Sequence, residues 1–258
     1  MLRKEAGEHT RLLCDTFFYR NTGKPFQDRP RLAFMNNPVH LYTPVHKGHR
    51  RRLCEMSVGA GRLDYTGQAA LDALSEELKA VVKILRLHTG HEERFIHPML
   101  SHRMPGGAEK LQADHRVINH MIDLLVAHFE GLKANDIASE RRQTLGLEFY
   151  LALNRFIAFY LSHINEEEEN AQPALRRLCT YDELVAAQDA IVASQTPEEA
   201  TESLEMMIPA LNLDEVAKLL GMAQKNAPPQ AFQNATTLAQ RLLSAEEWMA
   251  VKALLGIA

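Results

Sequence analysis

The sequence predicts an all-α protein, an up-down-up-down four-helix bundle with a C-terminal helical extension. From Gly67 onward, apolar residues recur at alternating steps of three and four, the spacing of helices that bury one face. Strand-like alternation of apolar and polar residues is absent from this part of the chain. Turn signals divide residues 44–178 into four helices, and they lie at Gly59-Ala60-Gly61, Met104-Pro105-Gly106-Gly107 and Ala134-Asn135-Asp136.

The helix starts follow from capping residues. Thr43-Pro44 opens the first helix with a cap and a proline at the first helical position. Beyond residue 180, shorter helices are expected to start at Thr196 and at Ser244, where Ser244 and Glu247 have the spacing of a capping box. Residues 1–40 have no long apolar period and are expected to be mostly irregular. We therefore divide the chain into an N-terminal extension (1–40), a bundle (41–180) and a C-terminal helical extension (181–258).

Composition excludes several classes of protein. The chain has 258 residues, with 29 Lys and Arg against 33 Asp and Glu, so its formal charge is −4. General nucleic-acid binding requires a surplus of basic residues, and a membrane span requires about 18 consecutive apolar residues. The chain has neither, its N-terminus lacks the apolar core of a secretory signal, and its three cysteines form no CxxC. We expect a soluble, cytoplasmic protein.

Histidine and glutamate interrupt the apolar stripes where leucine belongs. The inward spacing includes His46 and His49 in the first helix, His88 and Glu92 followed by Phe95 in the second, His115 in the third, and His163 and Glu167 in the fourth. A buried, unpaired carboxylate is costly unless something compensates its charge. A bound metal does so, because it takes neutral imidazoles and ionised carboxylates as ligands.

Spacing and order point to two metals. The pairs His88–Glu92 and His163–Glu167 each project from one helix face, and the string HxxxEExxxxPxL occurs twice, which suggests two similar helical hairpins. The candidate ligands fall near the starts of the first and third helices and near the ends of the second and fourth. In an up-down-up-down bundle these places lie at the same end. Four imidazoles and two carboxylates are too many for one ion and suit two.

This pattern resembles the hemerythrin-like (HHE cation-binding) proteins, which have a His, an HxxxE, a second His and a second HxxxE in four successive helices. The resemblance covers Pro44 to Leu178. It implies a four-helix bundle that holds two non-haem iron ions, with manganese or zinc as possible substitutes. It also implies terminal ligands and two bridging glutamates, namely His46, His88, His115 and His163 with Glu92 and Glu167. The segment after residue 180 is similar to the helical tail of some bacterial members.

The chain departs from the oxygen-carrying members of that family. Those have a second His four residues after the His of the third helix, where this chain has Asn119. They also have His-x4-Asp in the fourth helix, where this chain has Glu167 at the fourth position and Glu168, a possible substitute, at the fifth. In the first helix, His49 shares the stripe of His46 and could replace it. The implied set of four His and two Glu is one His short of the carriers.

The roles of the remaining polar residues in this region are open between function and structure. Glu93, Asp114 and Tyr160 lie beside ligands in sequence or on the inward stripe, where they could orient an imidazole, relay protons or serve the structure. Five further histidines fall off the inward stripes and are expected at the surface or behind the ligands: His91, His97, His102, His120 and His128.

Two classes of function remain open. The first is a protein that binds O2, NO or iron, or a sensor that acts by docking a partner, because the tail has no recognisable kinase, DNA-binding or receiver signature. The second is an enzyme that turns over NO, O2 or peroxide, or a protein that delivers iron for iron–sulfur cluster repair. A structural site holding zinc or manganese is a third alternative. A ferritin-like oxidase is disfavoured, because that class uses Glu-x-x-His, the reverse order.

Overall fold

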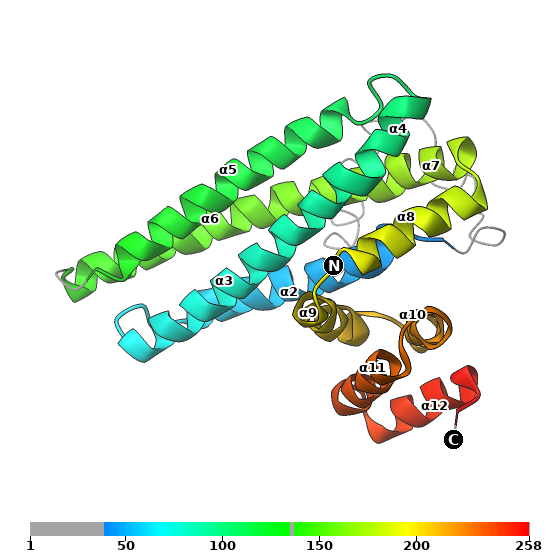
Figure 1. The fold of residues 1–258 in the computed structure, drawn as a ribbon. Helices are drawn as coiled ribbons and strands as arrows, with labels where there is room; N and C mark the ends of the chain where they lie inside the picture. Colours follow the sequence, from blue (N-terminus) through cyan, green and yellow to red (C-terminus); the bar gives the residue numbers. More distant parts are fainter. Residues whose placement is uncertain (1–38, 135–136, 258) are drawn as a thin grey trace, which may run out of the picture. The chain divides into compact units, whose positions relative to one another are not determined.

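Four long helices pack side by side in the computed structural model, which describes residues 39–134 and 137–257. They are α2 (Thr43–Arg62), α3 (Gln68–His91), α5 (Glu109–Leu132) and α6 (Ser139–Glu166). Each contacts two of the others, in the ring α2–α3–α5–α6 (Figure 1). The described residues contain no strand, and none of their helices has both the length and the apolarity needed to cross a membrane. The predicted all-α bundle with additional C-terminal helices is confirmed.

The apolar stripes form the core between these helices. Their inward residues are buried in a single cluster, which includes Leu53, Leu71, Leu78, Ile118, Phe129, Phe149 and Phe156. Burying one such side chain stabilises the fold by about 1.5–3 kcal/mol. Polar residues that share these stripes are therefore held inside by the packing of their apolar neighbours.

Each HxxxE helix ends in a single π-helical turn. Glu92–Ile96 (η2) follows α3, and Glu167–Ala171 (η3) follows α6. The N–H of His97 donates to the carbonyl of Glu92 five residues earlier, and the N–H of Gln172 does the same to Glu167. A proline comes next in both segments, and a proline cannot donate to the ladder and clashes with the carbonyl four residues back. The wider π-turn accommodates that break before α4 (His97–Arg103) and α7 (Gln172–Leu178) continue.

The π-turn changes which residues face inward. It contains one residue more than an α-turn, so the inward positions move along by one. Ile96 is buried, whereas Phe95 is only half-buried. The expectation that Phe95 continues the inward stripe is wrong for this reason.

The first expected turn is also displaced. α2 continues through Gly59-Ala60-Gly61 to Arg62, and the chain reverses over residues 63–67. A Cβ at Gly61 would lie 3.1 Å from the ring of Tyr150, so this glycine serves close helix packing. The second turn occurs as expected, with Gly106 at φ 79°. The third includes residues 135–136, which lie outside the described residues, as does the expectation for residues 1–38.

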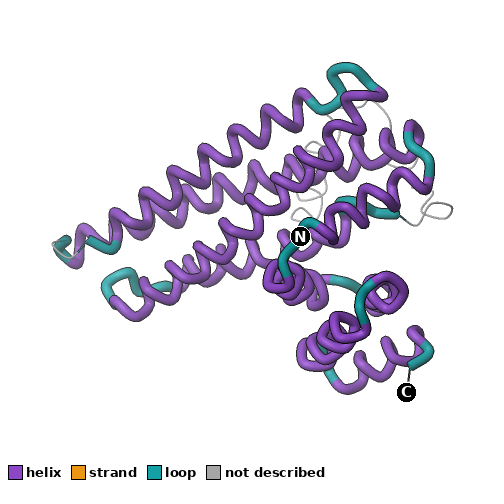
Figure 2. Tube along the Cα trace, in the orientation of Figure 1, coloured by secondary structure: helices purple, strands orange, loops and turns teal. Residues whose placement is uncertain are grey.

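Short helices joined by brief loops follow the bundle (Figure 2). They are α8 (Tyr181–Ala193), α9 (Pro197–Met207), η4 (Ile208–Ala210), α10 (Leu213–Asn226), α11 (Pro229–Leu242) and α12 (Ala245–Leu255). Complete capping boxes at Thr196 and Ser244 confirm the two predicted starts. η4 and α10–α12 share a separate apolar core around Leu220 and Trp248. The division at residues 40 and 180 stays a prediction.

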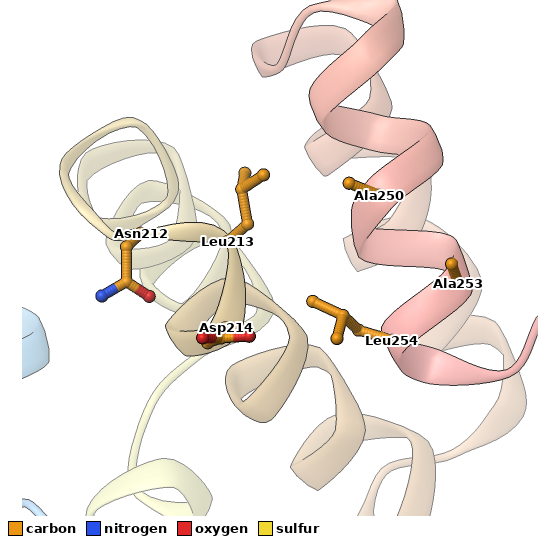
Figure 3. Close-up of a pocket in the computed structure, with 6 residues that line it drawn as sticks. All are labelled: Asn212, Leu213, Asp214, Ala250, Ala253 and Leu254. Carbon is orange, nitrogen blue, oxygen red and sulfur yellow. The ribbon is translucent and has the colours of Figure 1, made fainter.

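The extension meets the bundle along α2. α9 packs on α2, where a Cβ at Gly48 would lie 2.8 Å from the side chain of Met206. Lys47 forms an ion pair with Glu215 of α10 at 2.6 Å. The open pocket between α10 and α12 has a mostly apolar lining, with one carboxylate, Asp214, and no histidine or cysteine (Figure 3). It therefore offers no set of metal ligands.

Gly146→Ala tests the packing of α6. A Cβ at this position would lie 2.3 Å from the ring of Tyr65, which is itself buried. We expect the substitution to lower the free energy of unfolding by about 1–3 kcal/mol, measured by denaturant titration. The control is Gly131→Ala, because a Cβ there meets nothing within 4 Å. It should leave stability unchanged or raise it by about 0.5–1 kcal/mol. Equal stability of the two variants would contradict the packing of Tyr65.

Candidate metal centre

The structure brings all six predicted site residues together at one end of the bundle. They lie in the first turn of α2 (His46), the last turn of α3 (His88), the second turn of α5 (His115), the last turn of α6 (His163) and at the start of each π-turn (Glu92 and Glu167). None of the six is more than 8% exposed. Their metal-binding role is a proposal, whereas their convergence is a feature of the fold.

The six side chains form two overlapping groups. His46, His88, Glu92 and Glu167 offer ligand atoms that all lie within 4.8 Å of one another, and so do Glu92, His115, His163 and Glu167. Both glutamates belong to both groups. The arrangement therefore contains two adjacent positions for a metal, with a shared pair of carboxylates between them.

Glu92 turns one carboxylate oxygen to each group. Its Oε1 lies 3.0 Å from Nε2 of His88, and its Oε2 lies 3.2 Å from Nε2 of His115. Neither oxygen has a hydrogen bond of acceptable geometry, although both are buried. Close approach without hydrogen bonding is expected where atoms surround a common cation.

Glu167, from the other hairpin, likewise turns one carboxylate oxygen to each group. Its Oε2 lies 3.4 Å from Nε2 of His46, and its Oε1 lies 3.3 Å from Nε2 of His163. These two oxygens are also buried without a hydrogen bond. Four buried carboxylate oxygens would be costly without a compensating charge.

The donor set fits a pair of metal ions. Ligands at about 2.0–2.2 Å from one ion and at right angles to each other lie about 3 Å apart. The separations between the carboxylate oxygens and Nε2 atoms are close to this value, as is the 3.0 Å between Nε2 of His46 and Nε2 of His88. Imidazoles and carboxylates without a thiolate suit iron, manganese or zinc.

The electrostatics of the cluster favour a cation. Burial raises the pKa of Glu92, but the imidazoles of His88, His115 and His46 outweigh it and hold that pKa well below the usual range. Burial lowers the pKa of His46, but the hydrogen bond to Glu168 and the nearby carboxylates of Glu92 and Glu167 raise it to about 9. Burial likewise lowers the pKa of His115, but Glu167 and Glu92 raise it to about 10. The carboxylates thus remain ionised and attract positive charge.

Two carboxylates outside the converging groups contact the Nδ1 atoms of two imidazoles, on the side of each ring that faces away from the shared glutamates. Nδ1 of His46 is hydrogen-bonded to Glu168 at 2.9 Å, and Nδ1 of His115 contacts Glu93 at 3.2 Å. Each of these glutamates directly follows a glutamate shared by the two groups. An outer carboxylate of this kind fixes the orientation and tautomer of a ligating imidazole. The structure thus places Glu168, considered above as a substitute for Glu167, behind His46 and outside both groups.

Further contacts complete this outer layer. Asp114 lies 3.5 Å from Nδ1 of His163, too far for a strong hydrogen bond. Arg50 donates to Glu168 at 2.8 Å and to Asn165 at 2.7 Å. The apolar stripes and the HxxxE spacing do not point to Arg50. Its position four residues after His46, on the same helix face, is the signal that could have identified it.

His49 is buried beside the centre but is held differently from His46. Its Nδ1 forms a 2.7 Å hydrogen bond with the hydroxyl of Tyr160, while its Nε2 has no partner. Its ring centroid lies 4.6 Å from that of His88. His49 belongs to neither converging group, which supports His46 as the ligand from α2.

Among the other histidines, His97 departs from expectation. His102 and His120 are exposed, and His91 and His128 are half-buried. His97 is fully buried, and the expectation that it lies off the inward stripe is wrong. The cause is the π-turn of Glu92–Ile96, which rotates the following residue inward. The signal in the sequence was Pro98, which enforces a break in the α-helix at this point.

Comparison with known proteins gives a family match. A model of the hemerythrin HHE cation binding domain matches residues 37–175, which include the six converging residues. No curated protein and no solved structure matches the chain.

Removing an inward histidine should remove metal. We expect His88→Ala and His163→Ala each to lose most of the bound iron, because each deletes a ligand from one of the two groups. The control is His128→Ala, which changes a half-buried histidine that packs on Phe149. Iron is measured on folded protein after identical loading. Equal loss from all three variants would show that the ligand groups are wrong.

A second pair of variants tests the ligand from α2. His46→Ala should lose iron, whereas His49→Gln should retain it, because a glutamine can still hydrogen-bond Tyr160. Metal analysis and circular dichroism of both variants decide the matter. Retention of iron by His46→Ala with loss from His49→Gln would assign the ligand to His49.

Proposed function

This chain belongs to the hemerythrin HHE cation-binding family, and from its site geometry we propose that it is a non-haem di-iron protein that binds or reacts with O2, NO or peroxide. The proposal rests on one observation: Glu92 and Glu167 each direct one carboxylate oxygen to one pair of imidazoles and the other oxygen to the second pair. When bound, two iron ions would supply open coordination positions and a reversible change of oxidation state.

The number of protein ligands supports small-molecule binding. Two ions that each prefer about six ligands offer about twelve positions. Four imidazoles and four carboxylate oxygens occupy eight of these, given the two groups of converging side chains. The remaining positions are open to a small ligand, as in catalytic metal sites. The buried surroundings exclude large substrates and favour ligands of two or three atoms.

The chain holds the ligands firmly before any ion binds. Arg50 holds Glu168, and Glu168 in turn holds Nδ1 of His46. Glu93 orients the ring of His115 in the same way. Preorganised ligands reduce the conformational entropy that metal binding costs. The buried hydroxyl of Tyr42, which has no hydrogen-bond partner, lies on the helix turn before His46. Its raised pKa, caused by burial and then by Glu167 and Glu92, keeps it protonated and able to donate.

A sensor is the second candidate, and the contact between α2 and the extension favours it. His46 and Gly48 lie two residues apart, and Gly48 packs directly on Met206 of α9. Lys47, between them, pairs with Glu215 of α10. A small shift of α2 on ligand binding would therefore move α9 and α10 through these contacts. A protein partner that binds the extension could detect that movement.

Metal content tests the di-iron proposal. We expect two iron ions per chain after loading. Removal of the metal with a chelator should lower the melting temperature, because the ions compensate the negative charges of Glu92 and Glu167. Iron analysis and thermal unfolding measure both quantities. One ion or none per chain after loading would contradict the proposal, and retention of zinc in preference to iron would favour a structural site.

Reaction with small ligands tests the chemistry. The anaerobically reduced, iron-loaded protein should develop new visible absorption with NO and should convert to the oxidised form when O2 is added. His163→Ala, which lacks a ligand, should show a reduced response per chain. The spectra are followed over time. An iron-loaded protein whose spectrum is unchanged by excess NO and O2 would exclude a reactive centre.

A further inference from the structure

Equivalent positions after the two π-turns carry different side chains. His97 follows η2 and Gln172 follows η3, and both begin the helix that continues beyond the turn. Both residues are buried, because the additional residue of each π-turn rotates them inward. The two hairpins thus provide an internal comparison of what each side chain does at this place.

Gln172 has a structural contact that His97 lacks. The side-chain oxygen of Gln172 accepts a 2.9 Å hydrogen bond from the backbone N–H of Leu41, at the entry to α2. Neither ring nitrogen of His97 has a hydrogen-bond partner, although the residue is 0% exposed. An unpaired buried polar group destabilises a fold, and a leucine would fill the space without that cost. Packing alone does not explain an imidazole here.

His97 lies against the second group of ligands. Its ring centroid is 5.0 Å from that of His115. The centroid separation is similar within the pairs that share a proposed metal position, but those rings are edge-on, at 86° for His46 and His88 and 68° for His115 and His163, whereas His97 is stacked on His115 at 26°.

We propose that His97 supplies a fifth imidazole to the centre, as a ligand of the metal held by His115 and His163. The inference rests on the proposed di-metal function. His97 is outside the group whose ligand atoms already converge, so its ring reorients when it binds. No hydrogen bond holds the ring in its present orientation.

This ligand makes the two metal positions unequal. The position of His115 and His163 gains a third imidazole, whereas the position of His46 and His88 keeps two. The imidazole that Asn119 does not supply from α5 comes instead from α4.

The test compares His97→Ala with Gln172→Ala. Both remove a buried polar side chain at the equivalent place, so both should lower the melting temperature. Only His97→Ala should release one of its two iron ions faster, by about tenfold or more, when an excess of chelator is added. Added imidazole should slow that release again, because it can replace the missing ring. Gln172→Ala should release both ions at the rate of the unaltered protein.

A second readout reports the ligands directly. In the Co²⁺-loaded protein, His97→Ala should change the visible bands of one of the two ions, because those bands depend on coordination number and geometry. Should His97→Ala fail to fold, His97→Gln is measured in its place. Unchanged bands and unchanged release rates would overturn the proposal for His97. Binding of fewer than two ions by the unaltered protein would instead overturn the di-metal function.

Discussion

The charge of two adjacent buried carboxylates is the constraint on which this end of the bundle depends. Glu92 and Glu167 lie side by side in the interior, and repulsion between them is unfavourable at low dielectric. The fold offsets that repulsion with imidazoles on either side, so each carboxylate oxygen faces a nitrogen. An arrangement that surrounds two anions with imidazoles is preorganised for cations, and the loss of either glutamate would leave the other with excess imidazoles.

The orientation of the imidazoles depends on acidic and basic side chains that alternate from the centre of the cluster outward. His46 lies between Glu167 and Glu168, and Glu168 in turn lies against Arg50. His115 has the same relation to Glu92 and Glu93. Because the outer glutamate directly follows the shared glutamate in both hairpins, one short segment supplies both a carboxylate of the inner cluster and the group that orients an imidazole from a neighbouring helix. The duplicated string HxxxEE therefore encodes two layers of the site.

The π-turns give these segments their geometry. An α-helix through residues 92–98 would direct Phe95 inward, whereas the π-turn directs Ile96 and His97 inward. Proline in the position that follows makes this turn favourable, since the proline cannot donate to the helical ladder. The same local break occurs in both hairpins, but the side chains that it turns inward differ. Gln172 secures the entry to α2, and His97 lies against the imidazole of His115.

The sequence by itself determined the fold class and which side chains could converge, because inward spacing and helix ends depend on local periodicity and capping. Burial of His46, Glu92 and Glu167 followed from that spacing. Only the tertiary structure decided the register beyond each glutamate, where a proline-linked π-turn changes the period and buries His97. It also decided how oxygens and imidazoles are paired, since contacts such as that of Arg50 with Glu168 join residues far apart in the chain. Periodicity within one helix carries no information about which neighbouring helix supplies the partner.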